Sequence, residues 1–166
     1  MNLKSILIIG GGGHSKVVIE TALASCQFQK ISILDDKHNN NSPIQNKVLD
    51  HLVVGQCKEI YSEEFKRMYD HAFVALGNSE KRLHWLNTLK LNNYKIPTLI
   101  HPKAYISPSS KIGEGVLIAA NAAIQSSVHL KDGVIVNTGA TIDHDCNIDE
   151  GVHICPGVHL AGNVII

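Results

Sequence analysis

Hydrophobic residues recur at every sixth position through the last third of the chain. From residue 106 to residue 166, each sixth residue is Ile, Leu or Val without exception, and the residue two positions earlier is small or β-branched. A helix repeats at about 3.6 residues and a coiled coil at about 3.5, so neither explains this period. A period of six is typical of a repeat architecture in which each unit is one short strand and one bend. The repeated apolar positions are Ile106, Ile112, Ile118, Ile124, Leu130, Val136, Ile142, Ile148, Ile154, Leu160 and Ile166.

Gly, Asn and Asp gather in the short segments between these predicted strands, as at Gly115, Asn121 and Gly133. These residue types favour tight turns. Three six-residue units that close a triangular turn form a coil of about eighteen residues, with neighbouring coils about 4.8 Å apart. We therefore predict that residues 99–166 form a parallel β-helix with the apolar ladder inside. Each fully buried Ile or Val then contributes roughly 1.5–3 kcal/mol to stability.

The first 98 residues follow a different pattern, in which apolar runs alternate with amphipathic segments. Strands are predicted over 3–9, 30–34, 48–55, 71–76 and 96–100, and helices from residue 17, over 62–69 and over 80–91. The segment 38–47 is polar and turn-rich, which predicts a loop. Alternating strands and helices predict an α/β, Rossmann-like domain over 1–98.

The glycine run after the first strand is the main candidate for ligand binding in this domain. Gly11, Gly12 and Gly13, followed by His14, lie between a predicted strand and a predicted helix, where backbone N–H groups can approach a phosphate. Ser15 stands where the dinucleotide fingerprint has its third glycine, which disfavours a nicotinamide reductase. A tight turn without a ligand is the alternative reading.

Further candidates for this nucleotide site follow two later strands. Asp35, Asp36 and Lys37 end the second strand, about twenty residues after the glycines, where acidic residues commonly contact a nucleotide. Gly77 and Asn78 follow the strand that begins at residue 71. A solvated strand end is the alternative explanation for the acidic pair.

Composition excludes several classes of protein. Fifteen basic residues balance fifteen acidic ones, and no basic cluster occurs, which disfavours nucleic-acid binding. The start is too short for a signal peptide, and no apolar run approaches the ~18 residues of a membrane span. Four cysteines form no CxxC motif, so reduced, incidental thiols are expected. We expect a cytoplasmic protein without membrane insertion.

The whole chain resembles the bacterial sugar acyltransferases related to PglD and NeuD. The matching segments are IIGGGGHSK, the LDD strand end, ALGNSEKR, HPKAYIS, NTGATIDHDCNI and GVHICPGVHLAGNV, in the family's order. The resemblance implies a left-handed β-helix of hexapeptide repeats that assembles as a homotrimer. It also implies a cytoplasmic enzyme of surface-polysaccharide biosynthesis that transfers acetyl from acetyl-CoA to the amine of a nucleotide-linked amino sugar.

The resemblance assigns roles to four residues of the coil domain. His144 matches the catalytic histidine and Asp145 its acidic partner, while His153 matches a histidine near the acetyl group. Gly162 matches a glycine whose backbone N–H polarises the thioester carbonyl. The repeat supports the pairing, because Gly162 comes eighteen residues after His144, one coil later, and should stack on it.

Several alternatives stay open at this point. The chain could be an O-acetyltransferase acting on sialic acid or a related sugar. It could also be a nucleotide-sugar-binding trimer with little activity, because it stops at Ile166 without a polar cap and is expected to be a shortened form. The spacing of His144, His153 and His159 suggests no zinc site, so no metal is expected. The sequence does not choose the sugar, the nucleotide or the acyl chain.

Overall fold

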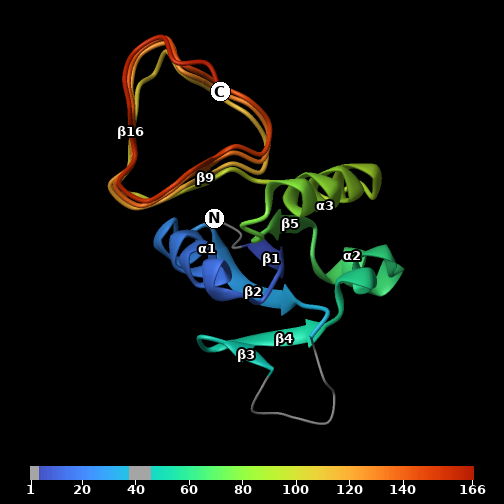
Figure 1. Ribbon diagram of the computed structural model, residues 1–166. Coiled ribbons are helices and arrows are strands. Elements are labelled where there is room, and N and C mark those ends of the chain that lie inside the picture. Colours follow the sequence, from blue (N-terminus) through green and yellow to red (C-terminus); the bar gives the residue numbers. More distant parts are fainter. Residues whose placement is uncertain (1–3, 38–45) are drawn as a thin grey trace. The chain divides into compact units, whose positions relative to one another are not determined.

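The computed structural model describes residues 4–37 and 46–166 and divides the chain into two compact units, 1–96 and 97–166. In Figure 1 the colour of the described residues follows the sequence, from blue near the N-terminus to red at the C-terminus. The first unit is a mixed α/β sheet domain, and the second is a three-sided parallel β-helix, so the predicted fold class is confirmed.

The first unit is built on a five-stranded sheet with the order β3-β4-β2-β1-β5. Strand β3 runs antiparallel to β4, and the other neighbours are parallel. All of Ile6 to Ile9 in β1 is buried, as expected for a central parallel strand covered on both faces. The strands are β1 (Lys4–Ile9), β2 (Phe28–Leu34), β3 (Lys47–Val48), β4 (His51–Gly55) and β5 (His71–Val74).

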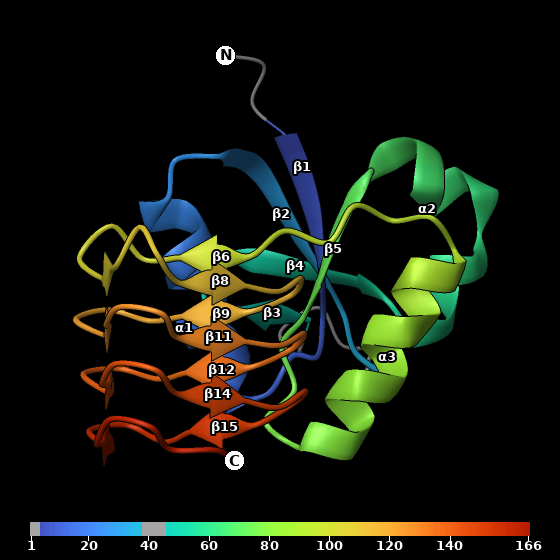
Figure 2. The same ribbon diagram turned by 90° about the horizontal axis from the view of Figure 1, so that it is seen from above.

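Helices cover both faces of this sheet, with α1 (Gly13–Ala24) on one side and α3 (Ser79–Leu91) on the other (Figure 2). The 3-10 helix η2 (Cys57–Tyr61) and helix α2 (Glu63–Met68) lie between β4 and β5 in the chain. Because both faces are covered, the carboxyl ends of the parallel strands remain as the edge at which loops can form a site.

Two expected strands differ in the structure. The segment 48–55 is a hairpin, because Leu49 adopts φ +52° and turns the chain between β3 and β4. The expected strand over 96–100 shortens to β6 (Leu99–Ile100), which pairs with β9 (Leu117–Ile118) and so belongs to the coil. Most of the expected loop over 38–47 lies outside the described residues.

The second unit consists of two-residue strands arranged in three sheets, one on each side of a triangular coil (Figure 1). The register joins residues eighteen apart, as at Ile124 and Ile142, which confirms the predicted coil length. The remaining strands are β7 (Tyr105–Ile106), β8 (Lys111–Ile112), β10 (Ala123–Ile124), β11 (His129–Leu130), β12 (Ile135–Val136), β13 (Thr141–Ile142), β14 (Asn147–Ile148), β15 (His153–Ile154) and β16 (His159–Leu160).

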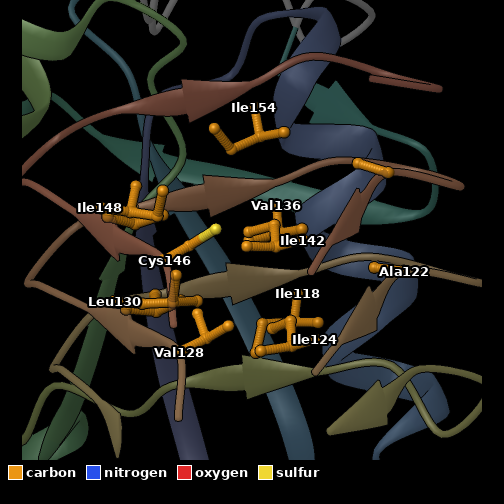
Figure 3. Close-up of a cluster of buried hydrophobic side chains, with 13 residues drawn as sticks. Ile118, Ala122, Ile124, Val128, Leu130, Val136, Ile142, Cys146, Ile148 and Ile154 are labelled. Atoms are coloured by element: carbon orange, nitrogen blue, oxygen red, sulfur yellow. The ribbon is translucent and has the colours of Figure 1, made fainter. Parts of the chain in front are cut away.

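The apolar ladder fills the interior of the coil. Ile118, Ile124, Val136, Ile142 and their neighbours are fully buried and point toward one another (Figure 3). Deleting the side chain of one such residue costs about 2–5 kcal/mol, because the stacked coils cannot collapse into the gap.

The three corners of the coil differ in the residue that adopts a left-handed backbone. One corner has only glycine there, at residues 115, 133 and 151. A second has Asn121, Gly139 and Gly157. The third has only residues with side chains, Ser127, Asp145 and Asn163, each near φ +60°. A side chain in this conformation is strained, and such strain concentrates at functional sites.

Candidate functional site

The third corner carries the predicted catalytic pair. His144 and Asp145 lie between β13 and β14, and their side chains are roughly half exposed. Nδ1 of His144 lies 2.8 Å from a carboxylate oxygen of Asp145, while the backbone N–H of His144 donates to Asp143 at 2.9 Å. The left-handed backbone of Asp145 turns its short side chain back toward the preceding residue.

The hydrogen bond to Asp145 raises the pKa of His144 above its ordinary value, and the negative charges of Asp143 and Asp145 add to this effect. Because Nδ1 is hydrogen-bonded to Asp145, Nε2 is the ring nitrogen that can exchange a proton with a substrate. An imidazole held in this way can accept a proton from an attacking group, and the carboxylate stabilises the resulting imidazolium.

Gly162 lies against His144 in the next coil, as the spacing of eighteen predicts. A Cβ atom built on Gly162 would lie 2.6 Å from both Cε1 and Nε2 of the imidazole. The next residue, Asn163, donates its backbone N–H to the carbonyl of His144 at 2.9 Å. The two predicted site residues therefore share one small region, although the role of Gly162 stays a prediction.

His153 lies on a different side of the coil. It begins β15, in the sheet β15-β12-β9-β6, whereas His144 lies at the corner that joins the other two sheets. Nε2 of His153 lies 3.0 Å from the side-chain amide of Asn137, which is buried. Within one chain, the structure does not bring His153 together with His144.

The glycine loop of the first unit borders a hollow of about 270 Å³ at the carboxyl ends of β1 and β2. Asp35 connects the glycine loop to the end of β2. Its carboxylate accepts the backbone N–H of Gly11 at 2.6 Å and that of Lys37 at 2.8 Å. Gly11, Gly12, Asp35 and Lys37 all line the hollow, so four of the predicted nucleotide-site residues are brought together.

Three further residues of this hollow were not predicted. Lys47, Val48 and Val53 come from the β3–β4 hairpin and close its side. Val48 and Val53 are nearly buried, so they offer an apolar wall, and Lys47 adds a second positive charge beside Lys37. The apolar run over 48–55 was visible in the sequence, but its fold into a hairpin was not.

Asp36 has a different environment from its neighbour Asp35. Its carboxylate accepts the backbone N–H of Cys57 at 3.0 Å, at the start of η2, and it is not among the residues that line the hollow. Burial, together with the nearby Asp36 carboxylate, raises the pKa of the Cys57 thiol to about 12, so this cysteine stays protonated.

The remaining predicted residues lie at the starts of helices. Gly13 and His14 form the first turn of α1. Asn78 caps α3, because its side chain accepts the backbone N–H of Lys81 at 2.9 Å. Gly77 precedes this cap, and its loop follows β5, which pairs with β1. The loops at residues 10–13 and 77–78 therefore follow neighbouring strands at the same sheet edge.

Arg82 of α3 stabilises the loop at residue 77 through hydrogen bonds to its backbone. Its guanidinium is buried and donates to the carbonyls of Leu76 at 2.7 Å and Gly77 at 2.9 Å. Removal from water lowers its pKa from the ordinary value. The sequence presents Arg82 within a charged helix start and gave no reason to expect it to be buried.

Neither a metal cluster nor a membrane span was found in the described part of the chain. Among residues 4–37 and 46–166, no three His, Cys, Asp or Glu side chains gather as metal ligands would. No described helix combines the length and apolar character that crossing a bilayer requires.

Comparison with known proteins places this architecture among sugar acetyltransferases. Residues 5–89 match the family model of the PglD N-terminal domain. A UDP-N-acetylbacillosamine N-acetyltransferase of Bacillus subtilis (strain 168) is 33% identical over 120 residues, which are 71% of this chain. That match covers 52% of the curated relative, so the chain spans about half of its length.

Two solved structures resemble nearly the whole chain. The acetyltransferase domain of PglB from Neisseria gonorrhoeae FA1090, in complex with acetyl coenzyme A, is 41% identical with a TM-score of 0.90, over 99% of this chain and 77% of that one. A mutant of GDP-perosamine N-acetyl transferase from Caulobacter crescentus, in complex with CoA and GDP-perosamine, is 33% identical with a TM-score of 0.88, over 97% and 73%.

Proposed function

The chain belongs to the family defined by the PglD N-terminal domain, and from this premise we propose that it transfers an acetyl group from acetyl-CoA to the amine of a nucleotide-linked amino sugar. The observation that carries the proposal is the pairing of His144 with Asp145 at a strained corner of the coil. Two of the relatives named above are described as N-acetyltransferases, which favours an amine over a hydroxyl as the acceptor.

The chemistry follows from which ring nitrogen is free. The acceptor nitrogen attacks the thioester carbonyl carbon and forms the new C–N bond, while Nε2 of His144 takes a proton from that nitrogen. Asp145 stabilises the imidazolium through Nδ1. The C–S bond then breaks, and the thiolate of CoA takes up the proton. General base catalysis of this kind contributes about 10²–10⁴-fold to a rate.

The nucleotide part of the acceptor is assigned to the hollow beside the glycine loop. Lys37 and Lys47 offer positive charge to a diphosphate, and Val48 and Val53 offer an apolar wall to a base or ribose. Relatives are described in complex with CoA and with a GDP-linked sugar, so both classes of ligand fit this family.

We further propose that the complete site uses two copies of the chain in a homotrimer. His144 and His153 lie on different sides of one coil, so they can serve a single acetyl group only if neighbouring copies supply one each. Mixing His144→Ala with His153→Ala protein after joint refolding should then restore part of the activity that each variant lacks. Failure to restore activity in demonstrated mixed trimers, or a monomer by light scattering at micromolar concentration, would contradict shared sites.

Release of CoA thiol tests the activity itself. The protein is mixed with acetyl-CoA and UDP-, GDP- or dTDP-linked amino sugars, and the matching hydroxyl sugars serve as a second arm. His144→Ala should lower kcat/KM by about 10²–10⁴-fold with nearly unchanged Tm, because the side chain is exposed. His84→Ala, an exposed histidine of α3, is the matched control. Wild-type activity in the His144→Ala variant would remove this residue from the mechanism, and activity only with hydroxyl sugars would favour an O-acetyltransferase.

A further inference from the structure

The imidazole of His144 occupies the space in which a side chain at residue 162 would lie. A Cβ atom at this position would lie 2.6 Å from Cε1 and Nε2 and 3.1 Å from Nδ1 of the ring. Cβ atoms essentially never approach another heavy atom closer than 3.0 Å. An alanine at residue 162 and the present position of His144 therefore exclude each other.

The backbone gives no other reason for glycine at this position. Gly151 and Gly157 adopt φ +66° and +68°, where a side chain is strained. Gly162 does not lie in this left-handed region, and the left-handed residue of its corner is Asn163 at φ +61°. The φ of Gly162 therefore does not demand glycine, and the reason for glycine is the space that the ring fills.

We propose that Gly162 is a positioning residue, whose missing side chain holds the His144 ring where Nδ1 reaches Asp145 and Nε2 stays available. The effect of this positioning on catalysis rests on the proposed function. The steric role is separate from the contact with the thioester that the resemblance assigns to the backbone N–H of Gly162.

The steric role has a direct chemical consequence. A methyl group at residue 162 must turn the ring away, because the atoms that it meets belong to the imidazole itself. Turning the ring breaks the hydrogen bond from Nδ1 to Asp145. That bond is the largest cause of the raised pKa of His144, so the pKa should fall toward its ordinary value.

The experiment compares Gly162→Ala with Gly157→Ala, which strains the backbone at another corner of the coil but meets no atom within 4 Å, and so controls for a general loss of coil stability. The His144 imidazole is followed by NMR titration, and its signal is assigned by its loss in His144→Ala. We expect a lower His144 pKa and a fall in kcat of about tenfold or more in Gly162→Ala, and neither effect in Gly157→Ala. An unchanged His144 pKa in a folded Gly162→Ala protein would overturn the proposal, even if the rate falls.

A stability cycle provides a second test that needs no activity. Gly162→Ala should lower Tm slightly in the wild-type background, because the displaced ring loses its hydrogen bond to Asp145, and should leave Tm unchanged in the His144→Ala background, where the ring is absent. Equal losses of Tm in the two backgrounds would overturn the steric role. If the wild-type chain transfers no acetyl group, the titration and the stability cycle still decide this inference, and only the proposed function fails.

Discussion

The side-chain amide of Asn137 lies 3.0 Å from Nε2 of His153, and a second hydrogen bond fixes which way the amide points. The backbone N–H of Thr138 donates to Oδ1 of Asn137 at 2.8 Å. The NH₂ group must therefore face His153, so Nε2 accepts and Nδ1 carries the ring proton. A buried asparagine thus selects one tautomer of the histidine assigned to the acetyl site.

Asn137→Asp should reverse this tautomer. The new carboxylate still accepts from Thr138, but it presents an acceptor to Nε2, so the ring proton should move to that nitrogen. Long-range ¹H–¹⁵N correlation spectra of the histidines report which nitrogen is protonated. Asn137→Ala is the control, because it removes the partner without imposing either tautomer. A His153 spectrum that is the same in all three proteins would contradict this reading of the hydrogen bond.

Asp145→Asn should shift the pH profile of acetyl transfer toward acid. His144 acts as a base only above its pKa, so activity falls as the pH drops through that value. The hydrogen bond to Asp145 raises this pKa, and an amide in its place removes the charge. The acid limb of kcat/KM should therefore move to lower pH, with a lower maximum because the imidazolium loses its stabilising partner. An acid limb at the wild-type pH would show that Asp145 does not set the basicity of His144.

Asp35→Ala and Asp36→Ala should separate the effect on nucleotide-sugar binding from the effect on stability. Asp35 clamps the glycine loop at the hollow, so its loss should weaken nucleotide-sugar binding. Asp36 accepts the N–H of Cys57 at the start of η2, so its loss should lower stability by about 1 kcal/mol and change affinity less. Calorimetric titration and chemical denaturation measure the two effects. An equal loss of affinity in both variants would support the prediction from the sequence that both carboxylates contact the nucleotide.

Arg82→Met should destabilise the first unit. Methionine fills much of the same volume but leaves the carbonyls of Leu76 and Gly77 without the donors that they now have. A hydrogen bond from a charged donor contributes about 1.5–3 kcal/mol, a loss that denaturation can resolve. Lys81→Met, at the preceding and exposed position of α3, is the matched control. A stability equal to that of the control would show that the buried guanidinium does not support this loop.

The repeat was the most informative feature of the sequence. A six-residue period defined the ladder, the coil length and the stacking of Gly162 on His144, because in a β-helix position along the chain translates directly into position in space. The alternation of strands and helices likewise predicted the α/β unit and the grouping of Gly11, Gly12, Asp35 and Lys37.

Contacts between residues outside this period depended on the tertiary structure. Asp35 and Asp36 are identical neighbours in the sequence, and only the strand end decides that one carboxylate turns to the glycine loop and the other to η2. Arg82 has the polarity of a surface residue, and it is buried because backbone carbonyls of the preceding loop converge on it.

The coil itself shows the same division. The sequence determined that His144 lies outside the coil, since it falls two residues after the ladder position Ile142. The period also places His144 and His153 on different sides of the triangle, because they are nine residues apart, half of an eighteen-residue coil. Only the folded coil decided that the Asn137 amide meets His153 from the preceding coil. The period determines which residues stack at a spacing of eighteen. Side-chain hydrogen bonds between residues at other spacings, such as Asn137 and His153, depend on the geometry of the corners.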